Sequence, residues 1–195
     1  MSDEQAIESG GLRVVFRRLA DRYAHRVELT HSEGAICLLE SVEGTAEDDW
    51  PPSPPLQELH FEHRGAERQL ALLVGRAGAS HWSLSIELDS AAATITFDAA
   101  CRVRSAAERL GSRYRSACTH RDPSGQSTGE PSPALWLQGA CWLQADAVQG
   151  RPSCELHCDQ GELLVTPAQT LGSWPQTARW RYSLAREKAV EAARS

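Results

Sequence analysis

Residues 75–88 read GRAGASHWSLSIEL, and the pattern of this stretch indicates the fold class. From residue 81 onward it alternates polar and apolar residues without interruption, which is typical of a β-strand with one buried face. Successive side chains of a strand point to opposite faces, so the stretch separates into two rows. The inward row is Trp82, Leu84, Ile86 and Leu88, and the outward row is His81, Ser83, Ser85 and Glu87.

The surrounding sequence continues the same pattern. Four runs of strand length follow one another with short connections rich in Gly, Ser and Asp: LQELHFEH (56–63), RQLALLVG (68–75), HWSLSIEL (81–88) and AATITFDA (92–99). Such spacing predicts an antiparallel meander. Further strands are expected at 35–42, within 134–148, at SCELHC and ELLVTP around a turn at 159–161, and at WRYSL. The sequence therefore predicts a mainly β protein, an antiparallel sandwich or open barrel.

Two segments bear on helix content. LRVVFRRLADRYAHRVELT (12–30) fits either an amphipathic helix or a hairpin that turns near Asp21. We favour the hairpin because β-branched and aromatic residues are frequent there and no good helix cap precedes it. At the other end, AREKAVEAARS (185–195) predicts a C-terminal helix.

The predicted organisation is a tail followed by one domain. Residues 1–10 are expected to be a disordered tail, and residues 11–195 a single β-rich domain. Four prolines and four acids in 43–55 predict an extended loop fixed by Trp50, with a docking motif for a proline-binding groove as the alternative. Residues 119–133, which lack apolar periodicity, predict a flexible surface loop.

Composition restricts the class of protein. The 195 residues are 41% hydrophobic and 24% charged, and the net charge of −6 disfavours a nucleic-acid partner. No run of 18 apolar residues predicts a membrane span, and the acidic start MSDEQAIESGG lacks the features of a secretion signal. We therefore expect a cytoplasmic protein, with its six cysteines present as mostly buried, reduced thiols.

The outward row offers candidate catalytic residues. If residues 89–92 form the turn, Ser83 lies opposite Asp98, and His81 lies diagonal to Asp98 at roughly 7 to 8 Å. A histidine, a serine and a carboxylate, from Asp98 or Glu87, are the groups that nucleophilic catalysis requires. No G-x-S-x-G elbow accompanies them. The alternative, which we favour, is the solvated face of an antiparallel sheet.

The turn before this strand suggests a ligand-binding site. In GRAGAS, Gly75 and Gly78 permit a positive φ, and Arg76 could meet an anion there. The predicted ligand-binding residues are Arg76, Gly78, Ser80 and His81. A plain hairpin tip would use the same glycines without any ligand.

No metal or cofactor is expected. Cys154, His157 and Cys158 would share one zinc ion only on a helical turn, with a fourth ligand such as Cys118 or His120. In a strand, the two cysteines lie roughly 13 Å apart with the histidine on the opposite face. Phosphate-loop, dinucleotide-binding, zinc-protease, EF-hand and kinase motifs are absent from the sequence.

Three functional hypotheses follow. The first is a non-catalytic protein that binds a protein partner or a small ligand through the polar sheet face near His81. The second is a hydrolase that uses His81 with Asp98 or Glu87. The third is a small structural zinc protein. A concave, partly dehydrated site would favour catalysis, whereas an open, solvated sheet face would favour binding.

Overall fold

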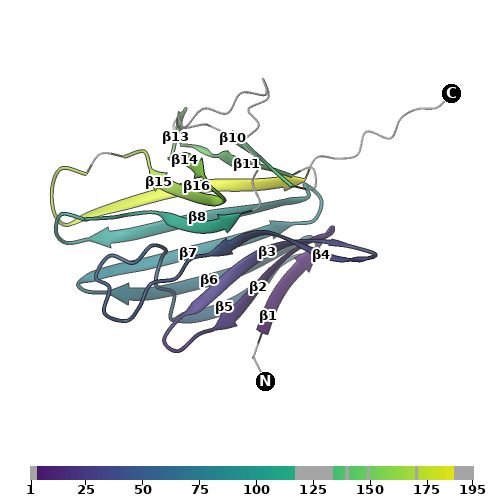
Figure 1. Cartoon of the computed structure of the whole chain (residues 1–195), viewed down its shortest axis with the longest axis horizontal. Coiled ribbons are helices and arrows are strands. Elements are labelled where there is room, and N and C mark those ends of the chain that lie inside the picture. Colours follow the sequence, from purple (N-terminus) through teal and green to yellow (C-terminus); the bar gives the residue numbers. More distant parts are fainter. Residues whose placement is uncertain (1–3, 117–133, 139–140, 149, 170, 187–195) are drawn as a thin grey trace.

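The structure is a computed structural model, and it describes residues 4–116, 134–138, 141–148, 150–169 and 171–186. Nearly all of its regular structure belongs to two antiparallel sheets of seven strands each, packed face to face (Figure 1). The predicted β-rich fold is confirmed in its sandwich form. The described residues contain no helix, and so none of the kind that could cross a lipid bilayer.

The first sheet has the strand order β1-β2-β3-β4-β9-β15-β14. Its strands are β1 (Glu4–Ser9), β2 (Leu12–Arg18), β3 (Tyr23–His31), β4 (Gly34–Ser41), β9 (Ser112–Ser116), β15 (Glu162–Pro167) and β14 (Cys154–Asp159). The predicted hairpin within 12–30 is confirmed, because β2 and β3 pair with Val14 opposite Val27. The tail prediction is wrong for Glu4–Ser9, which pairs along β2 and buries Ile7.

The second sheet has the strand order β10-β11-β16-β8-β7-β6-β5. Its strands are β10 (Ala134–Leu137), β11 (Cys141–Ala145), β16 (Gln176–Arg186), β8 (Thr94–Val103), β7 (Ser80–Asp89), β6 (Arg68–Ala77) and β5 (Glu58–Arg64). A separate two-stranded ladder joins β12 (Ala147–Val148) to β13 (Arg151–Pro152). The predicted meander is present as β5 to β8, which pair in sequence order.

The predicted C-terminal helix is not supported. Strand β16 continues to Arg186, and Ala185 pairs with Thr94 of β8. The first two residues of the predicted helix are therefore strand, because the sheet offers them a neighbour with free backbone groups. The remaining residues of that prediction, and the whole of the predicted 119–133 loop, lie outside the described part of the chain.

The two inner faces form one continuous core. Aromatic residues contribute much of its volume: Phe97 stacks on Tyr182 with ring centroids 4.8 Å apart, and Trp82 meets Trp180 edge to face at 6.1 Å. The Trp180 indole also donates to Ser112 of the first sheet at 3.1 Å. Hydrogen bonding across the core thus helps to fix how the two sheets are placed.

The loop at 43–55 covers one end of this core. It contains neither helix nor strand, and Pro51, Pro54 and Pro55 are buried. The half-buried Trp50 packs its ring on Trp82 at 6.5 Å, as predicted for a loop fixed by this residue. Ser53 exchanges hydrogen bonds with the backbone of Arg113 in the first sheet. The loop is therefore joined to both sheets.

The cysteines are not all reduced. Cys101 and Cys154 are buried free thiols, Cys37 is an exposed free thiol, and Cys141 is buried. Cys158 is disulfide-bonded, which corrects the expectation that every cysteine is a thiol. Burial raises the pKa of the Cys154 thiol to about 11, so this group stays protonated at neutral pH and behaves as a small apolar residue.

Candidate functional site

Strand β7 has the alternation predicted for it. Trp82, Leu84, Ile86 and Leu88 are each no more than 2% exposed. His81 and Ser83 are exposed on the opposite side, where Ser85 and Glu87 are partly exposed. The polar outer row is therefore confirmed, and the question becomes which residues stand beside it.

The predicted register between β7 and β8 is wrong by two residues. The chain turns through 90–93, because the Asp89 carboxylate accepts a hydrogen bond from the Ala92 amide at 2.9 Å and Ala93 takes a positive φ of 53°. Asp89 consequently pairs with Thr94. An aspartate that bonds the backbone of its own turn sets where the strand ends.

This shift removes the predicted catalytic grouping. Asp98 stands opposite Ser85 instead of Ser83, four residues along the strand from the residue opposite His81. The Asp98 carboxylate is held by the guanidinium of Arg179, with one Nε to Oδ1 distance of 2.7 Å. Glu87, the other proposed partner of His81, lies 3.5 Å from Arg68. The structure brings neither carboxylate to His81.

The corrected register places His81 beside two arginines. His81 stands directly between Arg76 on β6 and Arg102 on β8, and Thr177 on β16 follows opposite Arg102. All four side chains are exposed on the outer face of the second sheet. We call Arg76, His81 and Arg102 the cationic row. Directly opposite residues have Cβ atoms about 5 Å apart, so these groups share one small region of the surface.

The cationic row borders a surface depression of about 480 Å³. The small residues Ser83 and Ala100, which lie on the same sheet face as His81, form its floor, and Gly75 also lines it. Val74 gives it an apolar side and is 47% exposed, which is unusual for a large hydrophobic residue in the described part of this chain. The remaining lining residues are Gln57, Glu58, Trp82 and Thr177.

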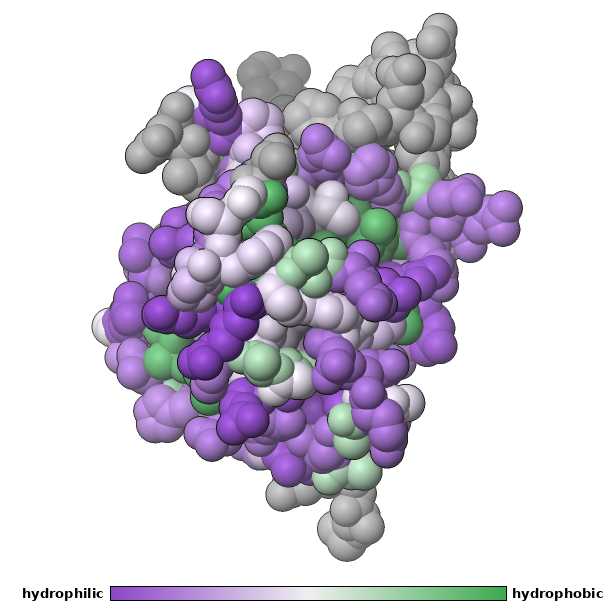
Figure 2. Space-filling view, turned by 90° about the vertical axis from the view of Figure 1, so that its left-hand side faces the viewer, coloured by the Kyte–Doolittle hydropathy of each residue, from purple (hydrophilic) through white to green (hydrophobic). Residues whose placement is uncertain are grey.

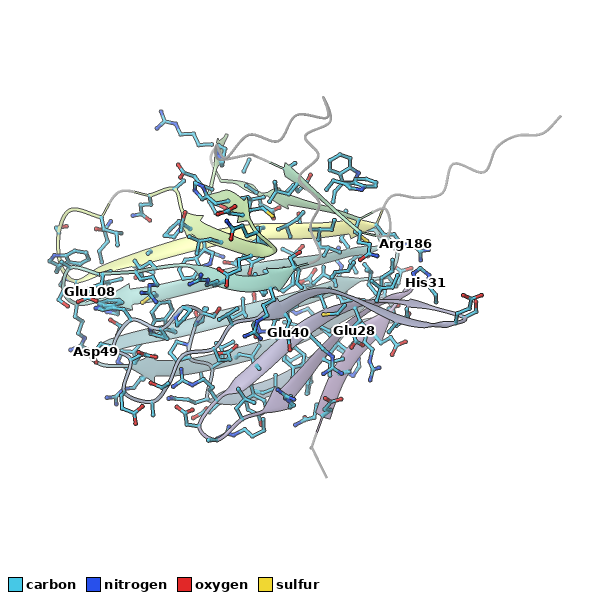
Figure 3. All side chains as sticks on the ribbon, in the orientation of Figure 1. Glu28, His31, Glu40, Asp49, Glu108 and Arg186 are labelled. Atoms are coloured by element: carbon cyan, nitrogen blue, oxygen red, sulfur yellow. The ribbon has the colours of Figure 1, made fainter. Side chains whose placement is uncertain are left out.

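The depression is lined by the last residues of β6 and the first residues of β7, and Figure 1 shows that these strand ends lie at one end of the sandwich. Figure 2 looks onto this end of the molecule, where hydrophilic residues surround a smaller group of near-neutral and hydrophobic ones. Asp49, from the loop at 43–55, lies at the same end (Figure 3). Its Oδ1 atom would be only 2.5 Å from a Cβ at Gly78, so the loop touches the tip of the β6–β7 hairpin.

The predicted ligand-binding residues divide into two groups. Arg76 and His81 both line the depression. Ser80 does not, because its side chain is buried, and Gly78 serves the turn with a φ of 52°. Gly75 needs no positive φ but lies against the loop, since a Cβ there would be 1.7 Å from the carbonyl oxygen of Pro55.

Several lining residues escaped the sequence analysis. Arg102 shares a face with Asp98, so a turn placed one residue later along the chain would have brought it opposite His81. Thr177 lines the depression because β16 pairs with β8 and places it opposite Arg102. The local sequence does not indicate which strands distant in the chain will pair.

A second, larger depression of about 850 Å³ lies on the first sheet beside residues 108–110. Its lining contains charges of both signs, and some of them are paired within the protein. Arg113 is bonded to Glu162, and the neighbouring His157 lies 3.5 Å from Glu155. Because Arg113 already has a partner and the acids Glu108, Asp159 and Glu162 also line this depression, it suits an anion less well than the depression at His81.

A buried polar cluster lies in the core between the sheets. The His25 ring contacts the Tyr114 hydroxyl at 3.1 Å, and Tyr114 in turn bonds the hydroxyl of Tyr182 on the second sheet. Burial lowers the pKa of His25 to about 4, and it raises the pKa of the nearby Glu43 carboxyl to about 7. Ser41 joins the two by accepting from the His25 amide and donating to Glu43. Because both His25 and Tyr114 are almost fully buried, we assign this cluster to the core.

The residues proposed for zinc are also separated. Cys154 and Cys158 point into the core along β14, whereas His157 is on the other face and partly exposed. The helical turn that would have gathered the three does not form. Within the described ranges, no three His, Cys, Asp or Glu side chains are grouped as metal ligands.

A scan of protein-family models finds no match to the chain, and a search of curated proteins finds no relative. The function must therefore be argued from the site itself.

Proposed function

We propose that this protein works by non-catalytic binding of a small ligand, through the depression beside His81 on the outer face of the second sheet. The observation that carries the proposal is the cationic row beside a floor of small residues. Polar groups that converge on a concave surface with an apolar side are typical of ligand sites.

The geometry supports binding over hydrolysis. A general base needs a partner that orients it, and the carboxylates proposed for that role are held by Arg179 and Arg68 instead. His81 and Ser83 are exposed to solvent, so the dehydrated environment that assists acyl transfer is missing at these two residues. We retain a cytoplasmic location and a partner other than nucleic acid as parts of the proposal.

The test is a fragment screen followed by amide NMR shifts. Fragments that bind are expected to shift the amides of β6, β7 and β8 around His81. Ser83→Trp should block them, because an indole on the floor would fill the depression while a tryptophan remains compatible with a strand. Glu155→Trp is the matched control at an exposed strand position on the first sheet. Hits that ignore Ser83→Trp, or that gather at the larger depression, would contradict the proposal.

A further inference from the structure

Building on the proposed function, we propose that the ligand of this depression carries a phosphate group, held between the guanidinium groups of Arg76 and Arg102 above His81. The ligand class is a small phosphate monoester whose remaining part rests on Ala100 and Val74. The argument uses the placement of three neighbouring strands, the pairing state of the charges, and the position of the nearest acids.

The spacing of the two arginines suits a tetrahedral anion. They lie on β6 and β8, with β7 between them, so their backbones are separated by two strand spacings, or about 9.5 Å. Two long side chains can converge on one group from opposite sides across that distance. A phosphate offers oxygens on both sides, whereas a carboxylate presents a single edge. His81 lies beneath the midpoint and can add a further donor.

The charges of the row are not neutralised within the described chain. Neither Arg76 nor Arg102 has a carboxylate oxygen within 4 Å among the described residues, although other arginines of the same sheet face do. Arg179, for example, is paired with Asp98 and Arg181 with Asp146. Arg76 and Arg102 carry like charges and line the same depression, so they repel each other. A bound anion would relieve this repulsion.

Two acids lie at the margin of the depression and restrict the ligand. Glu58 lines it from β5, opposite Val74, and Asp49 stands at the hairpin tip beside Gly78. Their charges disfavour a long polyanion, as does the net charge of −6. They favour a position for the phosphate toward Arg102 and the hydroxyl of Thr177. A single phosphate on a small molecule fits these limits.

The test measures binding of inorganic phosphate and methyl phosphate by NMR titration. Acetate is titrated in the same way to compare a carboxylate with the phosphates. We expect phosphate to shift the amides of Arg76, His81 and Arg102. Arg102→Gln and Arg76→Gln should each weaken the affinity about tenfold, the loss expected for one hydrogen-bonded charge pair. Glu58→Gln should strengthen it about threefold, because an exposed repulsive charge is removed.

Thermal unfolding supplies a second readout that separates binding from structure. In chloride buffer, Arg102→Gln should unfold at a higher temperature than the parent protein, because it lowers repulsion within the row. Replacing chloride by phosphate at constant ionic strength should then raise the midpoint of the parent more than that of the variant. A merely structural arginine would give a lower midpoint in both buffers.

The outcomes are distinguishable from those of the fragment screen. Neutral fragments at the depression, with no effect of phosphate, would overturn this inference and leave the proposed function standing. Acetate binding as tightly as phosphate would overturn the phosphate assignment. If neither fragments nor anions bind there, both proposals fail.

Discussion

At the scale of single residues, Glu43 has a carboxyl oxygen that is shielded from solvent. One of its oxygens accepts from the Ser41 hydroxyl at 2.6 Å, and the other has no partner in the described chain. Burial is the main cause of its raised pKa, and the partial compensation comes from Ser41 and the charge of Arg22. A group of this kind couples folding to pH.

Glu43→Gln should therefore change how stability depends on pH. The folded pKa of about 7 exceeds the ordinary value of 4.5, so the stability contributed by the neutral carboxyl is present below pH 4.5 and is lost as the pH rises through 7. The glutamine amide stays neutral at every pH. The free energy of unfolding of the variant should therefore exceed that of the parent by as much as about 3 kcal/mol at pH 8, and by little at pH 4.5. Urea unfolding at both pH values measures this. His25 titrates in both proteins and cancels in the difference, and a gap independent of pH would contradict the assignment.

At the scale of elements, local pattern predicted most strands and missed those with little apolar content. Strand β7 was predictable because its alternation is complete. Strands β1, with the sequence EQAIES, and β9, with SRYRS, each bury few apolar side chains, and both owe their conformation to pairing with neighbours.

Only part of the candidate site could be predicted from the sequence, for the same reason. His81 and Arg76 belong to one local hairpin, whereas Arg102 depends on the register of the next.

The register of the β7–β8 hairpin should be sensitive to Asp89. Asp89→Ala removes the carboxylate that accepts from the Ala92 amide and lies 3.2 Å from Arg68, and we expect the variant to unfold at a lower denaturant concentration than the parent. Asp89→Asn keeps the oxygen acceptor and loses only the charge, so its loss of stability should be smaller. Chemical unfolding of the two variants compares the turn bond with the ion pair. Equal losses would show that the ion pair, and not the turn bond, carries the effect.

At the scale of the whole molecule, the two sheets are joined by more than apolar contact. The Tyr114 hydroxyl on the first sheet meets that of Tyr182 on the second, and both rings lie fully within the core. Burial raises the pKa of both phenols, so the pair stays neutral. A neutral, buried hydrogen bond has a direction, and it can fix how the sheets are placed where apolar packing alone would tolerate small shifts.

A double-mutant cycle on this tyrosine pair should detect coupling between the sheets. Tyr114→Phe and Tyr182→Phe are each expected to cost about 1 to 2 kcal/mol, because each leaves a buried hydroxyl with fewer partners. The double variant should lose less than the sum of the two, by about 1 kcal/mol, since the second change removes the hydroxyl that the first left unpaired. Tyr23→Phe combined with Tyr182→Phe is the control, and it should be additive because Tyr23 is only partly buried and its ring faces Arg18 instead. Additive losses for the buried pair would mean that the contact between the two hydroxyls does not help to hold the sheets together. The relative placement of the sheets would then depend on apolar packing and on the hydrogen bond from Trp180 to Ser112.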